Sequence, residues 1–259
     1  MLSEFPGHLG RAAGEARDSL LVVVGGDGTV NEVVNGVAGT AAEIAVLPCG
    51  TGQDFGRTHG VPSRFDDAVR TALGGEARTI DLGRVECEGG PSRLFANVGS
   101  AGMSGAVARR ANAMTKRLGG RATFFYALTR EFIAWRNTRV TVELDGGIRR
   151  EGAMHDVIVA NGRYHGGGMK LAPDARQDDG LFDVVLIGDI GKVDFVTTAP
   201  KLYSGRYLSH PKVEPLRSST VTVDAAGALP LEVDGEPIGT TPARFAVVRS
   251  ALRLRVPAA

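Results

Sequence analysis

Two glycine-rich turns carry the residues whose types and spacing could do chemistry in this sequence. The first turn follows three valines and comprises seven consecutive residues, Gly25, Gly26, Asp27, Gly28, Thr29, Val30 and Asn31. The valines from position 30 onward recur at the helical period, which predicts a buried strand, a tight turn and a helix N-terminus. Because glycine lets the backbone approach an anion, and a helix N-terminus presents free N–H groups, this pattern favours phosphate binding.

The acidic residue inside this turn, Asp27, bears on how phosphate could bind there. Asp27 would direct negative charge at phosphate groups, which is tolerable when a divalent cation such as Mg²⁺ lies between them. The turn is not a P-loop, because no Gly-Lys-Ser/Thr follows it, and Asn31 stands where a Gly-x-Gly-x-x-Gly motif has its third glycine. The alternative interpretation is an ordinary strand-to-helix turn without a ligand.

A second turn follows the apolar stretch 44–47 and reads Pro-Cys-Gly-Thr-Gly-Gln-Asp-Phe over residues 48–55. Two strand ends that lie side by side at the carboxyl edge of a parallel sheet form a crevice, where ligands of open α/β sheets bind. We therefore expect Thr51 to join the first turn in one nucleotide site.

The elements that must position these turns alternate between helix and strand. Helices are expected at 3–19, 30–38 and about 63–73, with strands at 20–24 and 43–47, which predicts an α/β lobe with a parallel sheet. From about residue 79 the pattern changes to the period-two alternation of antiparallel strands, with helices inserted at 104–117, 121–136 and 192–204. The expected strands of this part are 138–144, 156–160, 181–187, 220–223, 229–233 and 252–256. We place the boundary near residue 82, giving a first lobe of 1–82 and a second of 83–259.

Composition excludes several classes of function. The net charge of +1 gives no general argument for nucleic-acid binding, and no apolar run approaches the about 18 residues that span a bilayer. The N-terminus lacks the pattern of a signal peptide, and the two cysteines, Cys49 and Cys87, make no disulfide framework. The five histidines are scattered, which disfavours zinc, and no Gly-x-Ser-x-Gly supports acyl hydrolysis. We expect a cytoplasmic protein, or one held peripherally at the inner face of the membrane.

Taken together, Gly25–Asn31 and Leu47–Phe55 resemble the diacylglycerol kinase catalytic family, which includes bacterial lipid kinases and the eukaryotic diacylglycerol, sphingosine and ceramide kinases. NAD kinases and phosphofructokinases share the Gly-Gly-Asp-Gly turn but lack the Leu-Pro-x-Gly-Thr-x-x-Asp-Phe segment. The resemblance implies a nucleotide-binding α/β lobe of the NAD-kinase and phosphofructokinase type, followed by a β-sandwich lobe. It also implies ATP- and Mg²⁺-dependent phosphorylation of a lipid hydroxyl, such as that of diacylglycerol.

The resemblance assigns a metal site to a later turn. After the glycine run 166–168 comes Asp178-Asp179-Gly180, which on spacing alone is a common turn. Bacterial relatives carry a structural Mg²⁺ at the matching turn. Carried over, its ligands are the carboxylate of Asp179 and the backbone carbonyls of Arg176 and Leu181.

The resemblance also indicates which segment holds the residue that accepts the proton of the lipid hydroxyl. Phosphoryl transfer to a hydroxyl needs a carboxylate that orients it and accepts its proton. The family has its proton acceptor in the segment Asp234-Gly235-Glu236, where we favour Glu236 and keep Asp234 as the alternative. The family also places the Asn and Gly of the segment 95–102 near the cleft between the lobes.

A basic segment could bring the protein to lipid. Residues 109–139 contain one acid, Glu131, among aromatic and aliphatic residues and eight cations, Arg109, Arg110, Lys116, Arg117, Arg121, Arg130, Arg136 and Arg139. A basic amphipathic segment with aromatics can lie on an anionic membrane surface. The alternative is a core helix with a basic outer face. The oligomeric state and the identity of the lipid are not predicted.

One departure from the family bears on activity. Relatives usually begin with a further strand and an Asn-Pro-x-x-Gly loop at the nucleotide, whereas this sequence begins at what resembles the following helix. We therefore expect the sheet to lack one strand and to expose an edge. Two explanations stay open: a fragment or late-start product, and a divergent member with a weakened nucleotide site. Beside a lipid kinase, the alternatives are an NAD-kinase-like small-molecule kinase and a catalytically silent lipid-binding protein.

Overall fold

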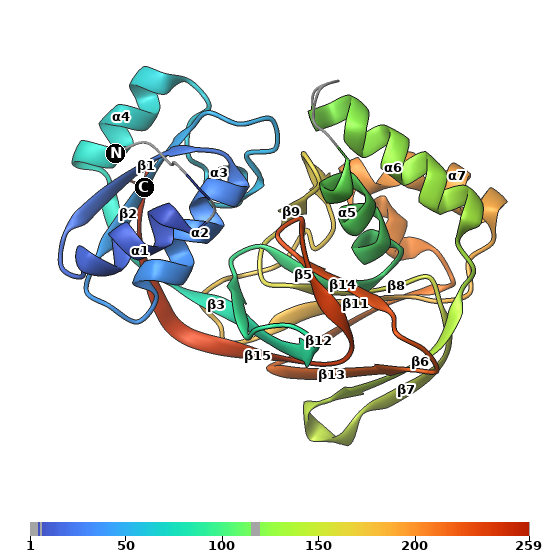
Figure 1. Cartoon of the computed structure of the whole chain (residues 1–259). Helices are drawn as coiled ribbons and strands as arrows, with labels where there is room; N and C mark the ends of the chain where they lie inside the picture. The colour runs from blue at the N-terminus through green and yellow to red at the C-terminus, as the bar shows by residue number, and fades with distance from the viewer. Residues whose placement is uncertain (1–4, 6, 115–119, 259) are drawn as a thin grey trace.

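The computed structural model describes residues 5, 7–114 and 120–258, which form two lobes joined by two long strands (Figure 1). In the first lobe, β1 (Leu20–Gly25) and β2 (Glu43–Pro48) pair in parallel. Around them lie α1 (His8–Glu15), α2 (Asp27–Val37), α3 (Asp54–Thr58) and α4 (Phe65–Gly74).

Strand β2 is buried on both faces, as a central strand of a parallel sheet must be. Ile44 and Val46 pack with the valines of α2, whereas Ala45 and Leu47 pack with apolar residues of α4 on the opposite face. This two-sided burial explains why the stretch reads as a continuous apolar run. The expected parallel sheet of the first lobe is confirmed.

Three local predictions for this lobe need correction. Helix α2 begins at Asp27 rather than at residue 30, because Gly26 already has the extended conformation of a residue that precedes a helix. The helix expected at 3–19 is observed only over His8–Glu15, with residues 1–4 and 6 outside the described part. The five-residue helix α3 was not expected.

The expected exposed edge is present at β1. Among the described residues β1 pairs only with β2, and Leu20, Val22 and Val24 on one face of the strand are exposed. The other face is covered, since Val23 packs in the same cluster as the α2 valines.

The second lobe is an antiparallel sheet covered by helices (Figure 1). Its core contains the fully buried rings of Phe95, Phe182 and Phe245. The helices are α5 (Met103–Ala113), α6 (Gly120–Ala134) and α7 (Lys192–Thr198), followed by the 3₁₀ helices η3 (Ala199–Ser204) and η4 (Arg206–Ser209). The strands are β4 (Arg93–Phe95), β5 (Val98–Gly102), β6 (Thr138–Leu144), β7 (Arg149–Met154), β8 (Asp156–Ala160), β9 (Tyr164–His165), β10 (Met169–Lys170), β11 (Phe182–Ile187), β12 (Val213–Ser218), β13 (Thr220–Ala225) and β14 (Pro230–Val233). The turn η2 (Asp145–Gly147) joins β6 to β7.

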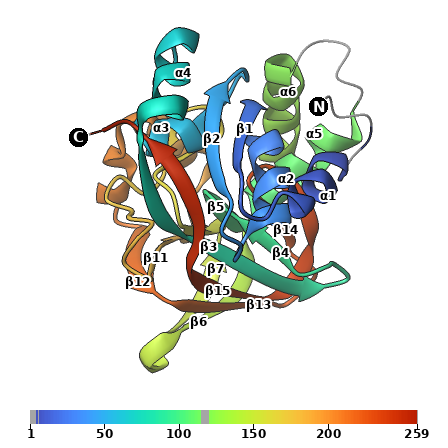
Figure 2. The same ribbon diagram turned by 90° about the vertical axis from the view of Figure 1, so that its left-hand side faces the viewer.

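Two strands run through both lobes (Figure 2). Strands β3 (Glu76–Glu88) and β15 (Glu236–Val256) are antiparallel along most of their length. The end of β15 pairs in parallel with β2, and Leu252, Leu254 and Val256 are buried in the core of the first lobe. A contiguous division at residue 82 therefore does not describe the lobes, because the chain returns to the first lobe at its end.

Candidate active site

The two glycine-rich turns lie against each other at the carboxyl ends of β1 and β2. Gly25 is paired with Pro48, and the Cys49 N–H donates to the Gly25 carbonyl at 3.0 Å. A Cβ on Gly50 would lie 2.6 Å from the Cα of Gly26, so glycine is required for this approach. The structure thus brings together the two segments that were predicted to share one crevice.

The N-terminus of α2 is open where an anion would bind. Gly26 precedes the helix without a side-chain cap, and a Cβ on Gly28 would meet nothing within 4 Å. Thr29 packs beneath Gly25, and Thr51 is exposed on the neighbouring turn. Val30 faces the core, so it could contribute only its backbone. Free N–H groups at such a terminus attract phosphate.

Two carboxylates meet beside these turns. Asp27 Oδ1 accepts a hydrogen bond from the Phe55 N–H at 2.9 Å, and a Cβ on Gly52 would lie 2.5 Å from Asp27 Oδ2. Asp54 is buried and accepts from Arg57 at 2.6 Å and from the Gly167 N–H at 2.7 Å. Burial raises the pKa of Asp54, and the nearby charge of Asp27 raises it further. Asp54 lies in a predicted motif, but the sequence alone indicates no role for its side chain.

Asn31 does not point toward the open turn. Its buried amide donates to Asp234 Oδ2 at 2.8 Å and to the Leu94 carbonyl at 3.2 Å. Side-chain contact of Asn31 with a nucleotide is therefore disfavoured by this geometry. The amide instead joins the first lobe to the turn that carries the predicted proton acceptor.

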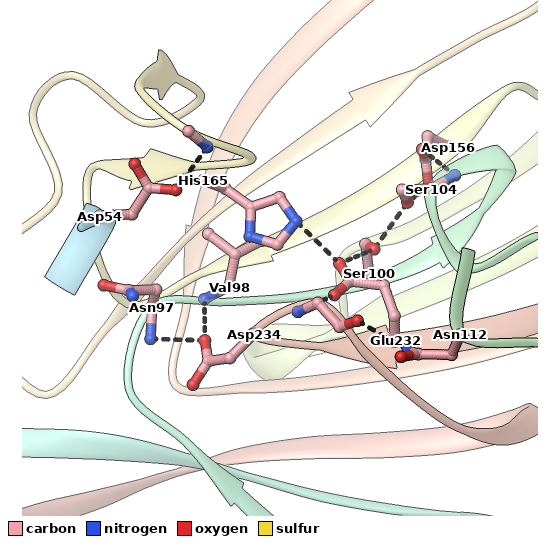
Figure 3. Close-up of polar contacts among 12 residues, drawn as sticks. Asp54, Asn97, Val98, Ser100, Ser104, Asn112, Asp156, His165, Glu232 and Asp234 are labelled. Atoms are coloured by element: carbon pink, nitrogen blue, oxygen red, sulfur yellow. Dashed lines mark hydrogen bonds and ion pairs between the residues drawn. The ribbon is translucent and has the colours of Figure 1, made fainter. Parts of the chain in front are cut away.

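Asp234 is a structural carboxylate in this arrangement (Figure 3). Besides Asn31, it accepts hydrogen bonds from the backbone N–H groups of Ala96, Asn97 and Val98 at 2.8 to 3.0 Å. Burial raises its pKa, and these backbone hydrogen bonds oppose that shift. With both oxygens bound to donors, Asp234 is poorly placed to take a proton from a substrate. The exposed Glu236, the first residue of β15, has no such set of partners in the described contacts.

Two further groups belong to this cluster of polar side chains, and neither was singled out in the sequence. Glu232 is buried; its Oε1 accepts from Ser100 Oγ at 2.5 Å and its Oε2 from the Gly235 N–H at 2.7 Å. His165 Nε2 lies 3.4 Å from Glu232 Oε1, and the imidazole lies between Asp54 and Glu232 (Figure 3). The only available signal was that His165 directly precedes the glycine run.

The charges around His165 come from both lobes. Burial by itself lowers the pKa of the imidazole, but Glu232, Asp54, Asp234 and Asp27 together raise it above its ordinary value. Four carboxylates and one imidazole therefore converge where the lobes meet, with the two glycine-rich turns on one side and the Asp-Gly-Glu turn on the other.

Asp179, the one side-chain ligand of the metal site implied at the later turn, has two partners in the protein. Asp179 Oδ2 pairs with Arg217, and Asp179 Oδ1 accepts from the Leu181 N–H at 3.1 Å. Arg176 pairs instead with the exposed Asp178. Across the described ranges no group of three His, Cys, Asp or Glu side chains could hold a metal ion. The Arg217 guanidinium thus faces the Asp179 carboxylate in this structure, and a Mg²⁺ site of Asp179 with the carbonyls of Arg176 and Leu181 stays a prediction.

The fold and the site define a class of protein. Residues 1–85 match the diacylglycerol kinase catalytic domain, and residues 97–256 match the YegS C-terminal NAD kinase beta sandwich-like domain. The chain therefore belongs to the family of diacylglycerol kinases and YegS-like lipid kinases, as the resemblance predicted.

Particular relatives agree with this assignment. The chain is 30% identical to a diacylglycerol kinase of Mycobacterium tuberculosis, over 96% of this chain and 81% of that protein. It is 36% identical to a probable lipid kinase YegS-like of Pseudomonas aeruginosa, over 92% of this chain and 76% of that one.

Solved structures confirm the fold. A putative diacylglycerol kinase from Bacillus anthracis superimposes with a TM-score of 0.78 at 23% identity, covering 98% of this chain and 82% of that one. Yeast NADH kinase superimposes with a TM-score of 0.52 at 14% identity, covering 92% and 61%. The expected likeness of the fold to that of NAD kinases is therefore supported by this NADH kinase structure.

The basic segment lies partly on an exposed apolar surface. Phe124, Phe125 and Tyr126 of α6 are exposed, and so are Val193 and Val196 of α7. Together with Ile133 of α6 and Tyr203 of η3, we call these residues the α6–α7 surface. Lys116 and Arg117 lie outside the described residues, and Arg110 pairs with Glu131. In the described part of the chain, no helix has the length and apolar character needed to cross a membrane.

Proposed function

We propose that this protein is a lipid kinase that transfers the γ-phosphate of ATP, bound with Mg²⁺, to the hydroxyl of a lipid such as diacylglycerol. Membership of the family supports the class of reaction. The observation that carries the proposal is the meeting of the two glycine turns with the Asp-Gly-Glu turn around one group of acids, since phosphoryl transfer needs a donor site and an acceptor site in line.

The proposed site has residues that bind the phosphate donor, ATP, and a residue that acts on the acceptor hydroxyl. The backbone of Gly25–Thr29 and the side chain of Thr51 would bind the phosphates of ATP. Asp27 and Asp54 are adjacent carboxylates, and the charge of Asp27 adds to the burial that raises the pKa of Asp54; they are a donor set that suits a hard cation. Mg²⁺ bound with ATP would neutralise the charge of the phosphates.

Glu236 is the proposed proton acceptor. The hydroxyl oxygen of the lipid forms a bond to the γ-phosphorus while the bond between that phosphorus and the β–γ bridging oxygen breaks, and ADP leaves. The hydroxyl proton passes to Glu236, an exposed carboxylate beside the fixed Asp234–Gly235 turn.

Substitutions at both sides of the cleft test this assignment. Asp27→Ala and Glu236→Gln should each lower ATP-dependent lipid phosphorylation by about a hundredfold or more, with the circular dichroism spectrum unchanged. The matched controls Asp18→Ala and Glu88→Gln alter exposed acids outside the cleft and should keep wild-type turnover.

Wild-type turnover in either cleft variant would contradict the proposal. Radiolabelled ATP offered with a panel of lipids and nucleotides distinguishes a lipid kinase from a small-molecule kinase. Calorimetry with Mg²⁺–ATP distinguishes both from a catalytically silent lipid-binding protein, which would show no binding.

We also propose that the protein contacts the membrane peripherally through the α6–α7 surface. Exposed aromatic and aliphatic side chains beside arginines suit an anionic interface, where a bilayer lipid substrate resides. Sedimentation with vesicles of neutral and of anionic lipid tests this contact. Equal absence of binding to both would contradict it.

A further inference from the structure

The turn that presents Glu236 is a tight hairpin turn. Val233 pairs with Glu236, so Asp234 and Gly235 form a two-residue hairpin loop, with positive φ values of 48° and 86°. A hairpin turn of this length favours positive φ, but a residue other than glycine pays a conformational cost for it. The Asp-Gly pair suits this turn type, and contacts from neighbouring groups determine where the turn lies.

Two carboxylates, the half-buried Asp234 and the buried Glu232, hold the turn in place. Asp234 is bound by the backbone N–H groups of residues 96–98, and Glu232 Oε2 accepts the N–H of Gly235 at 2.7 Å. The position of Glu236 thus depends on where the Glu232 carboxylate lies. A change in the orientation of Glu232 would release the N–H of Gly235 and loosen the turn.

Glu232 in turn needs partners for its other oxygen, because an uncompensated buried carboxylate is costly. Ser100 Oγ donates to Oε1, and that hydroxyl is itself 2.6 Å from Ser104 Oγ, which bonds to Asp156 at 2.8 Å. These neighbours carry no positive charge. The partner of Glu232 that can carry a positive charge among the described contacts is His165, whose Nε2 lies 3.4 Å from Glu232 Oε1 (Figure 3).

Contacts with the first lobe hold the hairpin that carries the His165 imidazole. His165 lies on β9, and the turn between β9 and β10 donates the Gly167 N–H to Asp54 of α3 at 2.7 Å. A Cβ on Gly168 would lie 3.4 Å from the Arg57 guanidinium, so this hairpin rests against α3. The charged groups that face the imidazole are Asp27 of α2, Asp54 of α3, Glu232 of β14 and Asp234 of the following turn.

We propose that His165 is a positioning residue for the acceptor side of the cleft: by its contact with Glu232 it fixes the turn that presents Glu236. This inference rests on the proposed function, because it concerns the residue that would accept the proton. The chain of contacts runs from Asp54 through Gly167 and His165 to Glu232, and from there to Gly235. It connects the donor side of the cleft to the acceptor side.

Two substitutions of His165 separate positioning from a merely structural role. His165→Leu removes the contact with Glu232 and should lower kcat about tenfold or more, while KM for ATP changes less than about twofold. His165→Gln can still donate to Glu232 and should keep at least about a third of the wild-type kcat. The control Tyr164→Phe, on the same hairpin, should stay within about twofold of wild type.

A double-variant cycle tests the pathway. If His165 acts through Glu232, adding His165→Leu to Glu232→Leu should change kcat by less than about twofold, because the contact is already lost. Independent, multiplicative losses would overturn the proposal. Equal losses in His165→Gln and His165→Leu would overturn it as well, because a donor at this position would then be irrelevant.

A readout without turnover distinguishes this inference from the proposed function. In histidine NMR spectra, the His165 ring is identified by its absence in His165→Gln. Glu232→Gln should shift the titration of that ring to lower pH, because an adjacent negative charge is removed. If the wild type phosphorylates no lipid but this shift occurs, the proposed function fails and the contact stands. If the ring titrates as in the wild type, the proposed contact is wrong.

Discussion

Two carboxylates separated by one glycine have different environments in this protein. Asp234 receives four hydrogen bonds from N–H donors of both lobes, whereas Glu236 is exposed at the start of β15. A carboxylate that satisfies several backbone donors stabilises the fold, because each donor would otherwise be left unpaired. These environments indicate that Asp234 stabilises the fold, and they agree with the proposal that Glu236 accepts the proton.

We expect Asp234→Ala to lower the free energy of unfolding by about 2–4 kcal/mol, because the N–H groups of residues 96–98 lose their acceptor. Asp234→Asn keeps one acceptor oxygen and should cost less. Urea unfolding followed by circular dichroism measures both effects. Asp224→Ala, an exposed acid on β13, is the matched control and should change the free energy by less than about 0.5 kcal/mol.

A different outcome would reverse the two roles. If Asp234→Ala unfolds like the wild type but loses lipid phosphorylation, the carboxylate acts in the chemistry and the structural assignment is wrong.

For individual residues, the contact between the two glycine-rich turns could be predicted from the sequence. The direction in which each side chain points could not. Asn31 was expected at the nucleotide, yet its amide bonds to Asp234, which lies 203 positions away in the sequence. Local patterns predict which strand ends are adjacent, because the fold class determines that. They carry no information on which distant carboxylate an amide will meet. Glu232 and His165 were missed for the same reason.

At the scale of helices and strands, segments with a regular period-two alternation of apolar and polar residues were predicted correctly. Segments with an irregular pattern were not. The expected strands at 138–144 and 156–160 coincide with β6 and β8. Strand β15 was expected only over its last five residues, because register shifts near residues 241 and 250 interrupt the period-two pattern. Helix α3 is one turn long, too short for a periodicity, and the Asp27 carboxylate binds its Phe55 N–H.

Helices α6 and α7 lead to a prediction about membrane contact. Phe125→Glu and Val193→Glu should each weaken binding to anionic vesicles by about tenfold or more, because insertion of a large apolar side chain contributes about 1.5–3 kcal/mol. Both residues are well exposed, at 70% and 78%, so the fold should tolerate the change. Vesicle sedimentation measures the effect.

The matched control for these variants is Leu73→Glu. Leu73 is 74% exposed on α4 of the first lobe, so this substitution adds the same charge to an exposed apolar position outside the α6–α7 surface. We expect unchanged vesicle binding. An equal loss in all three variants would show that net charge, rather than this surface, determines binding.

At the scale of the whole molecule, the two lobes share their strands. Strands β3 and β15 pass from one core to the other, and Leu254 near the end of β15 is fully buried among first-lobe residues such as Val23 and Ile44. The Asn31–Asp234 and Asp54–Gly167 hydrogen bonds join the lobes again at the cleft. The lobes should therefore unfold together, although the family comparisons divide the chain into two domains.

Because the lobes are coupled, we expect a substitution in the core of one lobe to lower the stability of the other as well. Leu254→Ala opens a cavity in the first-lobe core and should lower the free energy of unfolding by about 2–5 kcal/mol. The single tryptophan, Trp135, packs against the cores of the second lobe, so its fluorescence reports that lobe. In a cooperative molecule, Leu254→Ala shifts the urea midpoint of Trp135 fluorescence as much as that of circular dichroism. Leu73→Ala, the same substitution at an exposed position, should leave both midpoints in place; an unshifted Trp135 midpoint in Leu254→Ala would mean that the lobes unfold independently.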